Sequence, residues 1–389
     1  MTNRQVVYEY NKIKNTIVED YIKIQKDIHK YFTFSFDGIS ATQYCGSISY
    51  NNQNIQILPK IAKNNDVNLQ IFSYMLSYVY DLELKDIDTN KNNDKNTKNT
   101  LFEAIIQFFA KDLYQELSKG IYKEYISVVQ NSMTLRGKYL VSNNIKHNFI
   151  NEKIYCQYDD FSIDNQLNQF FLYAIKQLSQ YTQNHKFLKQ CEYILNNVTN
   201  IQIDINNFNI KFNRLNQRFK HIYHKAMVLL NHSIFTYNSK NDGYTFLFDM
   251  NELFEIFISK IVNDIDLSAK LQYKKSFGNM TLIPDIICQD IIIDTKYKII
   301  KDKEDTKSKD MQQMFVYGIN FKKKNVILLY PKHMQQQNYH LNAGIDDSII
   351  NIYVKTIDLD ADALDYKDYI KLIEERINTI LREFRDERN

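Results

Sequence analysis

A short stretch near residue 290 constrains the fold more than any other part of the chain, because it combines the character of a buried strand with charged side chains. Two apolar runs, 282–288 and 291–297, flank Gln289 and Asp290. Short β-branched runs bounded by polar residues are typical of buried strands joined in a hairpin. The sequence therefore predicts an antiparallel hairpin that turns at Gln289 and Asp290.

The length of the loop decides which side chains face one another across this hairpin. With a loop of two or four residues, position 288 faces 291, 287 faces 292, and 285 faces 294. Asp285 and Asp294 are then neighbours on one face, with Cβ atoms about 5 Å apart. The period of two places Lys296 on the same face. A loop of three residues would instead send Asp285 to the opposite face.

Two carboxylates side by side in a sheet repel each other unless a proton or a cation lies between them. Mg²⁺ accepts one or two carboxylates and completes its shell with water and phosphate oxygens. We therefore expect Asp285 and Asp294 to bind Mg²⁺, or Mn²⁺ in its place. If the metal also binds a substrate phosphate, Lys296 would hold or deprotonate the water molecule that attacks this phosphate, or would neutralise charge that develops on it. The alternative is a surface hairpin with solvated ion pairs, against which the run Ile291-Ile292-Ile293 argues.

The segments on either side of the hairpin indicate how it is built into a domain. Asp249-Met-Asn-Glu252 has the form of a capping box and begins a helix in which Glu255 lies at the edge of the apolar stripe. After the hairpin, Ser308 begins a helix that leads to a continuous apolar strand, 326–330. The order strand, helix, strand predicts a right-handed crossover, and therefore a mixed sheet.

The arrangement Pro284-Asp285 followed by Asp294-Thr295-Lys296 resembles the PD-(D/E)xK nuclease superfamily. More narrowly, it resembles the McrC family, the nuclease subunits of 5-methylcytosine restriction systems. Other segments similar to that family follow in the same order along the chain, at 44–48, 57–61, 134–138, 246–255 and 310–317.

This resemblance implies an α+β chain with a mixed α/β partner-docking module at residues 1–156 and a restriction-endonuclease-like α/β domain, a mixed sheet flanked by helices, at 157–389. It implies a Mg²⁺-dependent endonuclease that cuts modified duplex DNA in a type IV restriction system. The implied partner is an McrB-like AAA+ GTPase ring whose GTP hydrolysis the chain stimulates, and self-association through the nuclease domain would allow double-strand cutting. The resemblance also suggests Glu255 as a further metal-site acid, and Gln313 as a ligand of the attacking water or a DNA phosphate.

Composition sets further bounds. At 389 residues, 44% of them hydrophobic, the chain is long enough for two globular domains. Its 49 basic and 46 acidic residues are too balanced to indicate DNA binding, so any contact must come from local clustering, for which the charged segment 298–309 is a candidate.

The start of the chain is unlike a signal peptide and no apolar run reaches the length of a membrane span, so a cytoplasmic protein is expected. Four scattered cysteines disfavour a disulfide framework and a zinc site.

Three other positions are weaker candidates. Gly137 is expected to supply a positive φ or a close backbone approach, and Arg136 to contact a partner or cap the preceding helix. Ser132 stands where a Walker A motif needs glycine, so the chain is not expected to bind a nucleotide by that motif. His221 and His224 have a metal-binding spacing, but no third ligand lies nearby in sequence, so a solvated pair is expected.

Two other functions are compatible with the sequence. The chain could be a free-standing PD-(D/E)xK repair or recombination nuclease, although no helicase or separate DNA-binding motif accompanies it. It could instead be a non-catalytic adaptor that activates an NTPase ring. The intact set of Asp285, Asp294 and Lys296 argues against the adaptor.

Overall fold

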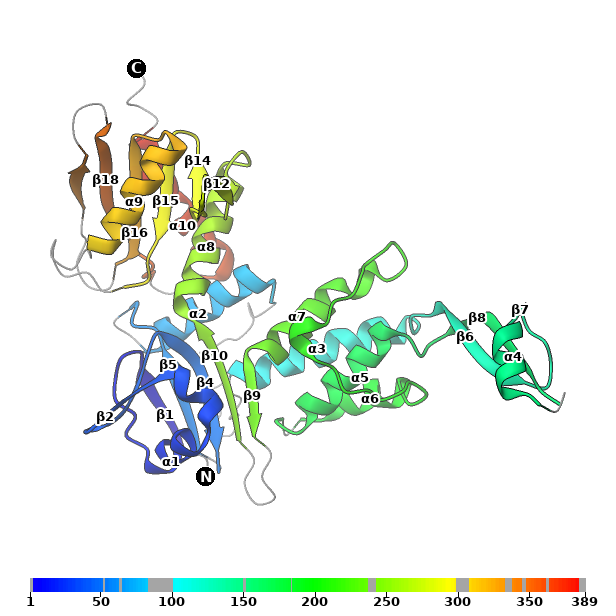
Figure 1. Ribbon diagram of the computed structural model, residues 1–389. Helices are drawn as coiled ribbons and strands as arrows, with labels where there is room; N and C mark the ends of the chain where they lie inside the picture. Colours follow the sequence, from blue (N-terminus) through cyan, green and yellow to red (C-terminus); the bar gives the residue numbers. More distant parts are fainter. Residues whose placement is uncertain are drawn as a thin grey trace. The chain divides into compact units, whose positions relative to one another are not determined.

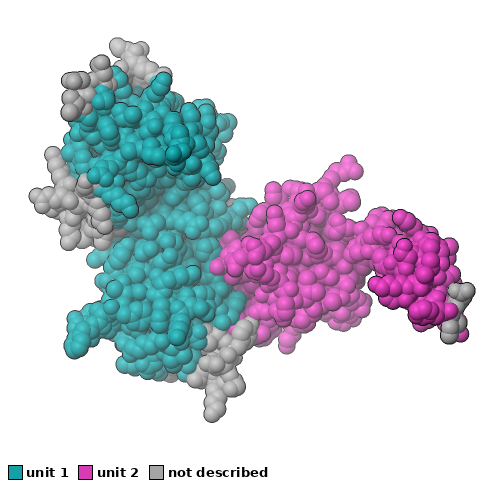
Figure 2. All heavy atoms as spheres, in the orientation of Figure 1, with its two compact units in different colours: residues 1–102, 232–389 teal, residues 103–231 magenta. Residues whose placement is uncertain are grey.

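The computed structural model describes residues 3–51, 53–62, 65–82, 101–149, 152–182, 184–236, 243–298, 308–332, 338–344, 348–361 and 364–384. The chain divides into two compact units, residues 1–102 with 232–389 and residues 103–231 (Figure 2). The first unit contains two larger sheets, and the second contains a group of helices and a small sheet (Figure 1). The fold class is therefore α+β, as the sequence predicts.

The amino-terminal sheet of the first unit is built from two distant parts of the chain. Its strand order is β1 (Asn3–Tyr8), β5 (Gln53–Leu58), β4 (Tyr44–Tyr50), β10 (Gly243–Asp249) and β9 (Ser233–Thr236). Strands β4 and β5 form an antiparallel hairpin, and β10 pairs antiparallel with β4. Gly46 permits this pairing, because a Cβ at its φ of +150° would overlap the carbonyl oxygen of Phe246.

Shorter elements surround this sheet. They are α1 (Thr16–Ile24), the 3-10 helix η1 (Lys26–Tyr31), β2 (Phe32–Ser35), β3 (Gly38–Ala41) and α2 (Asn65–Tyr80). Helix α1 begins at the N-cap Asn15, whose side chain accepts from the backbone N–H of Val18.

The second sheet of this unit contains the predicted hairpin. Its strand order is β11 (Lys270–Leu271), β14 (Ile286–Cys288), β15 (Ile291–Thr295), β16 (Asn325–Pro331), β18 (Ile350–Ile357) and β17 (Tyr339–Ala343). Cys288 faces Ile291 and Ile286 faces Ile293, which is the predicted register. Helix α9 (Ser308–Phe321) leads to β16, which is parallel to β15, so the mixed sheet is confirmed. A small hairpin, β12 (Lys275–Phe277) and β13 (Met280–Leu282), precedes β14.

Helices α8 (Met250–Ile265) and α9 both contact β15. Met314 and Tyr317 of α9 share an apolar cluster with Ile292. The ring of Tyr297, two residues after the end of β15, packs against Phe254 of α8, with centroids 5.9 Å apart. Helix α10 (Tyr366–Arg382) packs against α8.

The second unit consists of helices α3 (Leu101–Ser118), α5 (Gln166–Ser179), α6 (Lys186–Ile194) and α7 (Lys220–Asn231), the 3-10 helices η3 (Ile205–Asn207) and η4 (Gln217–Phe219), and a sheet of β6 (Glu124–Ser132), β8 (Ile154–Ser162) and β7 (Lys138–Tyr139) with α4 (Val141–His147). Lys225 of α7 and Asp112 of α3 form an ion pair of 2.6 Å in which the lysine side chain is 3% exposed. This pair ties two helices of the unit together.

Several boundaries differ from those expected. The division at 156/157 falls inside β8, and a cut there would split the β6–β8 pairing. The amino-terminal sheet also needs β9 and β10, which lie beyond that division. Residues 299–307 of the charged segment lie outside the described part of the chain.

Among the helices described, none is both long and apolar enough to cross a membrane.

Candidate active site

The two expected aspartates lie together at one end of the β14–β15 hairpin, but they are not partners in the strand ladder. The ladder ends at the pair Ile286–Ile293. Asp285 instead forms side-chain hydrogen bonds with β15: its Oδ2 accepts from the backbone N–H and from the hydroxyl of Thr295, at 2.8 and 2.9 Å. The predicted cross-strand pairing of Asp285 with Asp294 is thus replaced by a side-chain contact one residue further along β15.

Asp294 is the buried centre of the site. Its side chain is 1% exposed, and the Lys296 ammonium lies 2.5 Å from its Oδ2. Burial raises the pKa of Asp294, the charge of Asp285 raises it further, and the charge of Lys296 opposes both. Burial alone would lower the pKa of Lys296, but the charges of Asp294 and Asp285 outweigh that effect and raise it. The site therefore holds more negative charge than its one lysine balances.

Glu255 of α8 reaches this site through Gln272. The Gln272 side-chain amide donates to Oε1 of Glu255 and, at 3.3 Å, to Oδ1 of Asp285. The backbone N–H of Gln272 donates to the carbonyl oxygen of Asp285 at 2.8 Å. Burial, followed by the charges of Asp285 and Asp294, raises the pKa of Glu255 from 4.5 to about 7. Sequence reasoning does not find Gln272, because its two side-chain contacts are 17 and 13 residues away along the chain.

Gln313 of α9 lies beside Asp294. Its amide nitrogen lies 3.5 Å from Oδ1 of Asp294 and donates to the Tyr317 hydroxyl at 2.9 Å. That hydroxyl donates in turn to the carbonyl oxygen of Ile283 at 3.0 Å. Helix α9 is thus tied to the segment that leads into Asp285. All five expected site residues, Asp285, Asp294, Lys296, Glu255 and Gln313, lie in one connected group.

The residues present suit a divalent cation by their chemistry, although they do not form a finished metal cage. Within the described ranges, no group of three or more His, Cys, Asp or Glu side chains is arranged to hold a metal ion. Asp285 and Asp294 are two hard oxygen donors crowded in a buried place, and Glu255 is held by Gln272. Two carboxylates supplemented by water and phosphate oxygens are a usual set for Mg²⁺. A cation there would relieve the repulsion that raises the pKa of Asp294.

The other sequence candidates lie in the second unit. Gly137 has a φ of +65°, and a Cβ there would overlap the carbonyl oxygen of Gln157, so both expectations for this glycine are confirmed. The Arg136 guanidinium lies 5.7 Å from the centre of the Tyr158 ring. Helix capping by Arg136 is wrong, because α3 ends at Ser118 and β6 follows it.

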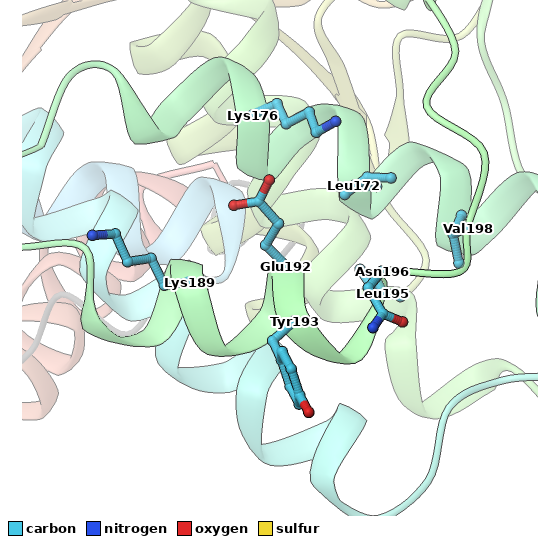
Figure 3. Close-up of a pocket in the computed structure, with 8 residues that line it drawn as sticks. All are labelled: Leu172, Lys176, Lys189, Glu192, Tyr193, Leu195, Asn196 and Val198. Atoms are coloured by element: carbon cyan, nitrogen blue, oxygen red, sulfur yellow. The ribbon is translucent and has the colours of Figure 1, made fainter.

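A surface pocket of about 550 Å³ also lies in the second unit, along α5 and α6 (Figure 3). Its apolar floor is formed by Leu172, Leu195 and Val198, and Lys176 and Glu192 approach it from the two helices (Figure 3). The lining contains none of the five expected site residues, so the pocket is separate from the acidic site.

A mixed sheet packed by helices, with two aspartates and a lysine at one end of a hairpin, defines the class of protein: an α+β protein whose second sheet is consistent with a nuclease-like domain. The model of one family, described as McrBC 5-methylcytosine restriction system component, matches residues 39–331. The chain belongs to this family.

Two solved structures are similar to the chain. One is a chain of a refined half-complex from a tetradecameric assembly of Thermococcus gammatolerans McrB AAA+ hexamers with bound McrC, with a TM-score of 0.64 and 22% identity over 97% of this chain and 100% of that one. The other is a chain of the Thermococcus gammatolerans McrBC complex, with a TM-score of 0.50 and 26% identity over 67% of this chain and 87% of that one. No curated protein matched the sequence.

Proposed function

We propose that the chain is the DNA-cleaving subunit of a modification-dependent, type IV restriction system, and that it hydrolyses phosphodiester bonds of modified duplex DNA with Mg²⁺. The observation that carries this proposal is the buried Asp294 paired with Lys296 at 2.5 Å, beside Asp285. A structural ion pair alone would not require a second carboxylate in the same buried place, since that carboxylate only adds repulsion.

Each residue of the group has a role in this proposal. Asp285 and Asp294 would hold the ion, joined by Glu255 when Gln272 releases it. The ion would lower the pKa of a bound water and stabilise charge on the phosphate. Lys296, whose ammonium lies beside Asp294, would orient the attacking water or donate to a phosphate oxygen. Gln313, which donates to the Tyr317 hydroxyl, would position the same water or phosphate.

We propose further that the chain docks on a ring-forming AAA+ GTPase of the McrB kind and stimulates its GTP hydrolysis. Two findings support this: the family membership, and the similarity to a chain of an assembly of McrB AAA+ hexamers with bound McrC. Cutting both strands needs two sites, which self-association through the nuclease domain would supply.

Cleavage of a methylated plasmid in the presence of Mg²⁺ tests the proposal and separates it from its alternatives. We expect cutting only when the GTPase partner and GTP accompany the chain. Cutting by the chain alone would instead favour a free-standing nuclease. Stimulated GTP hydrolysis without any cutting would favour a non-catalytic adaptor.

A further inference from the structure

The segment that contains β11 and the β12–β13 hairpin, beside the acidic site, has a strongly basic surface. Lys270, Lys274 and Lys275 are all exposed, and no acidic residue occurs from 267 to 284. The charge of these three lysines equals the net charge of +3 of the entire chain. The chain as a whole is nearly balanced, so this short segment is a marked local concentration of positive charge.

The hairpin is joined to the site at both of its ends. Gln272, just before β12, binds Glu255 and Asp285, and Ile283, just after β13, accepts from Tyr317. Only Pro284 separates Ile283 from Asp285. The basic surface is therefore held in place by the residues that build the acidic site.

Helix α9 contacts Asp294 near its start and the β12–β13 hairpin at its end. Gln313, Tyr317 and Phe321 are four residues apart and lie on one face of the helix. Gln313 contacts Asp294, while the Phe321 ring packs on Phe277 of β12 with centroids 5.1 Å apart. A rise of about 1.5 Å per residue separates the two ends of this row by about 12 Å.

The positive charge of these three lysines is not neutralised by acidic neighbours within the part of the chain that the structure describes. No carboxylate of the described residues lies within ion-pair distance of them, whereas Lys298 and Lys323 are both paired with aspartates. The Lys275 ammonium instead lies 4.9 Å from the centre of the Phe277 ring, and that of Lys270 lies 4.9 Å from the Tyr273 ring. Their positive charge is thus available to an external anion.

We propose that Lys270, Lys274 and Lys275 bind the phosphate backbone of the DNA whose scissile phosphate lies at Asp294. This inference rests on the proposed nuclease function and names a contact of the same site. One strand of a duplex carries a phosphate about every 3.4 Å of its axis, so phosphates three to four steps from the cut lie about 12 Å away. Such contacts fix the path of the duplex without reading its sequence.

Binding of a fluorescent 30-base-pair duplex to the full chain in EDTA tests this proposal without any cleavage. The variant is Lys274→Gln with Lys275→Gln, and the matched control is Lys367→Gln with Lys371→Gln, which removes two exposed lysines of α10. We expect the hairpin variant to bind several-fold more weakly at about 0.1 M salt. The slope of log affinity against log salt should fall by about 1.8, or about 0.9 for each lost phosphate contact. The control should keep the wild-type slope, and Lys274→Arg with Lys275→Arg should restore it.

An unchanged slope in the folded hairpin variant would overturn the inference, as would failure of the wild type to bind the duplex at low salt. A wild type that binds with the expected slope but never cuts with Mg²⁺ and partner would instead refute the nuclease proposal and leave the contact standing. Circular dichroism of each variant identifies any loss of folding, and the arginine variant then decides the outcome.

Discussion

The Gln272 side chain lies between the carboxylates of Glu255 and Asp285, where a cation would reduce their repulsion. Its amide donates to Glu255 and Asp285, while the Lys296 ammonium lies beside Asp294. The three acids are therefore stabilised by the N–H dipoles of one amide and by one ammonium. A bound divalent cation would replace these hydrogen-bond donors and would balance the negative charge of the crowded carboxylates more strongly.

Replacing Gln272 with alanine is predicted to destabilise the metal-free protein and to increase its response to metal. The two acids lose a shared donor, which costs about 1–3 kcal/mol for a partly buried charged group. Melting temperatures with EDTA and with a saturating concentration of Mg²⁺ measure both effects. Gln289→Ala is the control, because Gln289 also donates to an aspartate, Asp266, but away from the site. Equal responses of the two variants to Mg²⁺ would contradict this role.

At the scale of elements, the sequence predicts the β14–β15 hairpin because its apolar runs and its tight turn are local signals. It does not reveal the position of Asp285, since a side-chain bond to Thr295 leaves no periodic pattern. Nor does the sequence reveal the sheet of β6 and β8. No residue of β6 is buried, so this strand lacks the alternation of buried and exposed residues that marks a half-buried strand.

This small sheet and α4 expose many large apolar side chains, which indicates a docking surface. The side chains exposed by half or more are Tyr125 72%, Val129 52%, Met133 77%, Leu135 55%, Val141 53%, Ile145 72%, Phe149 90% and Phe161 54%. We predict that Ile145→Asp with Phe149→Ser abolishes stimulation of the partner's GTP hydrolysis, because an apolar interface would bury a charge. Tyr193→Ser, at an equally exposed side chain of α6, should keep it. Stimulation by the double variant at the wild-type level would place the contact elsewhere.

At the scale of the first unit, one buried acid connects its two sheets. Glu9 follows β1, and its Oε1 accepts from the backbone N–H of Lys60 and from the Tyr297 hydroxyl, each at 2.8 Å. Tyr297 directly follows Lys296 in the chain. Burial raises the pKa of Glu9 from 4.5 to about 7, although the Lys60 N–H and the Tyr297 hydroxyl lower it. The amino-terminal sheet thus supports the end of the strand that carries Asp294 and Lys296.

The raised pKa of Glu9 predicts a specific dependence of stability on pH. A folded-state pKa above the unfolded value means that the folded protein binds the proton more tightly. Its contribution is therefore complete below about pH 4.5 and is lost as the pH rises through about 7, at a cost on the order of 3 kcal/mol. Glu9→Gln keeps an acceptor but has no charge, so its free energy of unfolding should fall less than that of the wild type between pH 5 and 8. Parallel curves from urea unfolding of the two proteins would contradict a buried, proton-binding Glu9.

We propose that Asp294 and Lys296 carry out DNA cleavage. Single-turnover cleavage of a methylated duplex by the full chain with its GTPase partner, GTP and Mg²⁺ tests this, when the wild type is compared with Asp294→Asn and Lys296→Ala. Both variants should lose cleavage by orders of magnitude, while stimulation of GTP hydrolysis stays at the wild-type level. Wild-type cleavage by either variant would contradict the site.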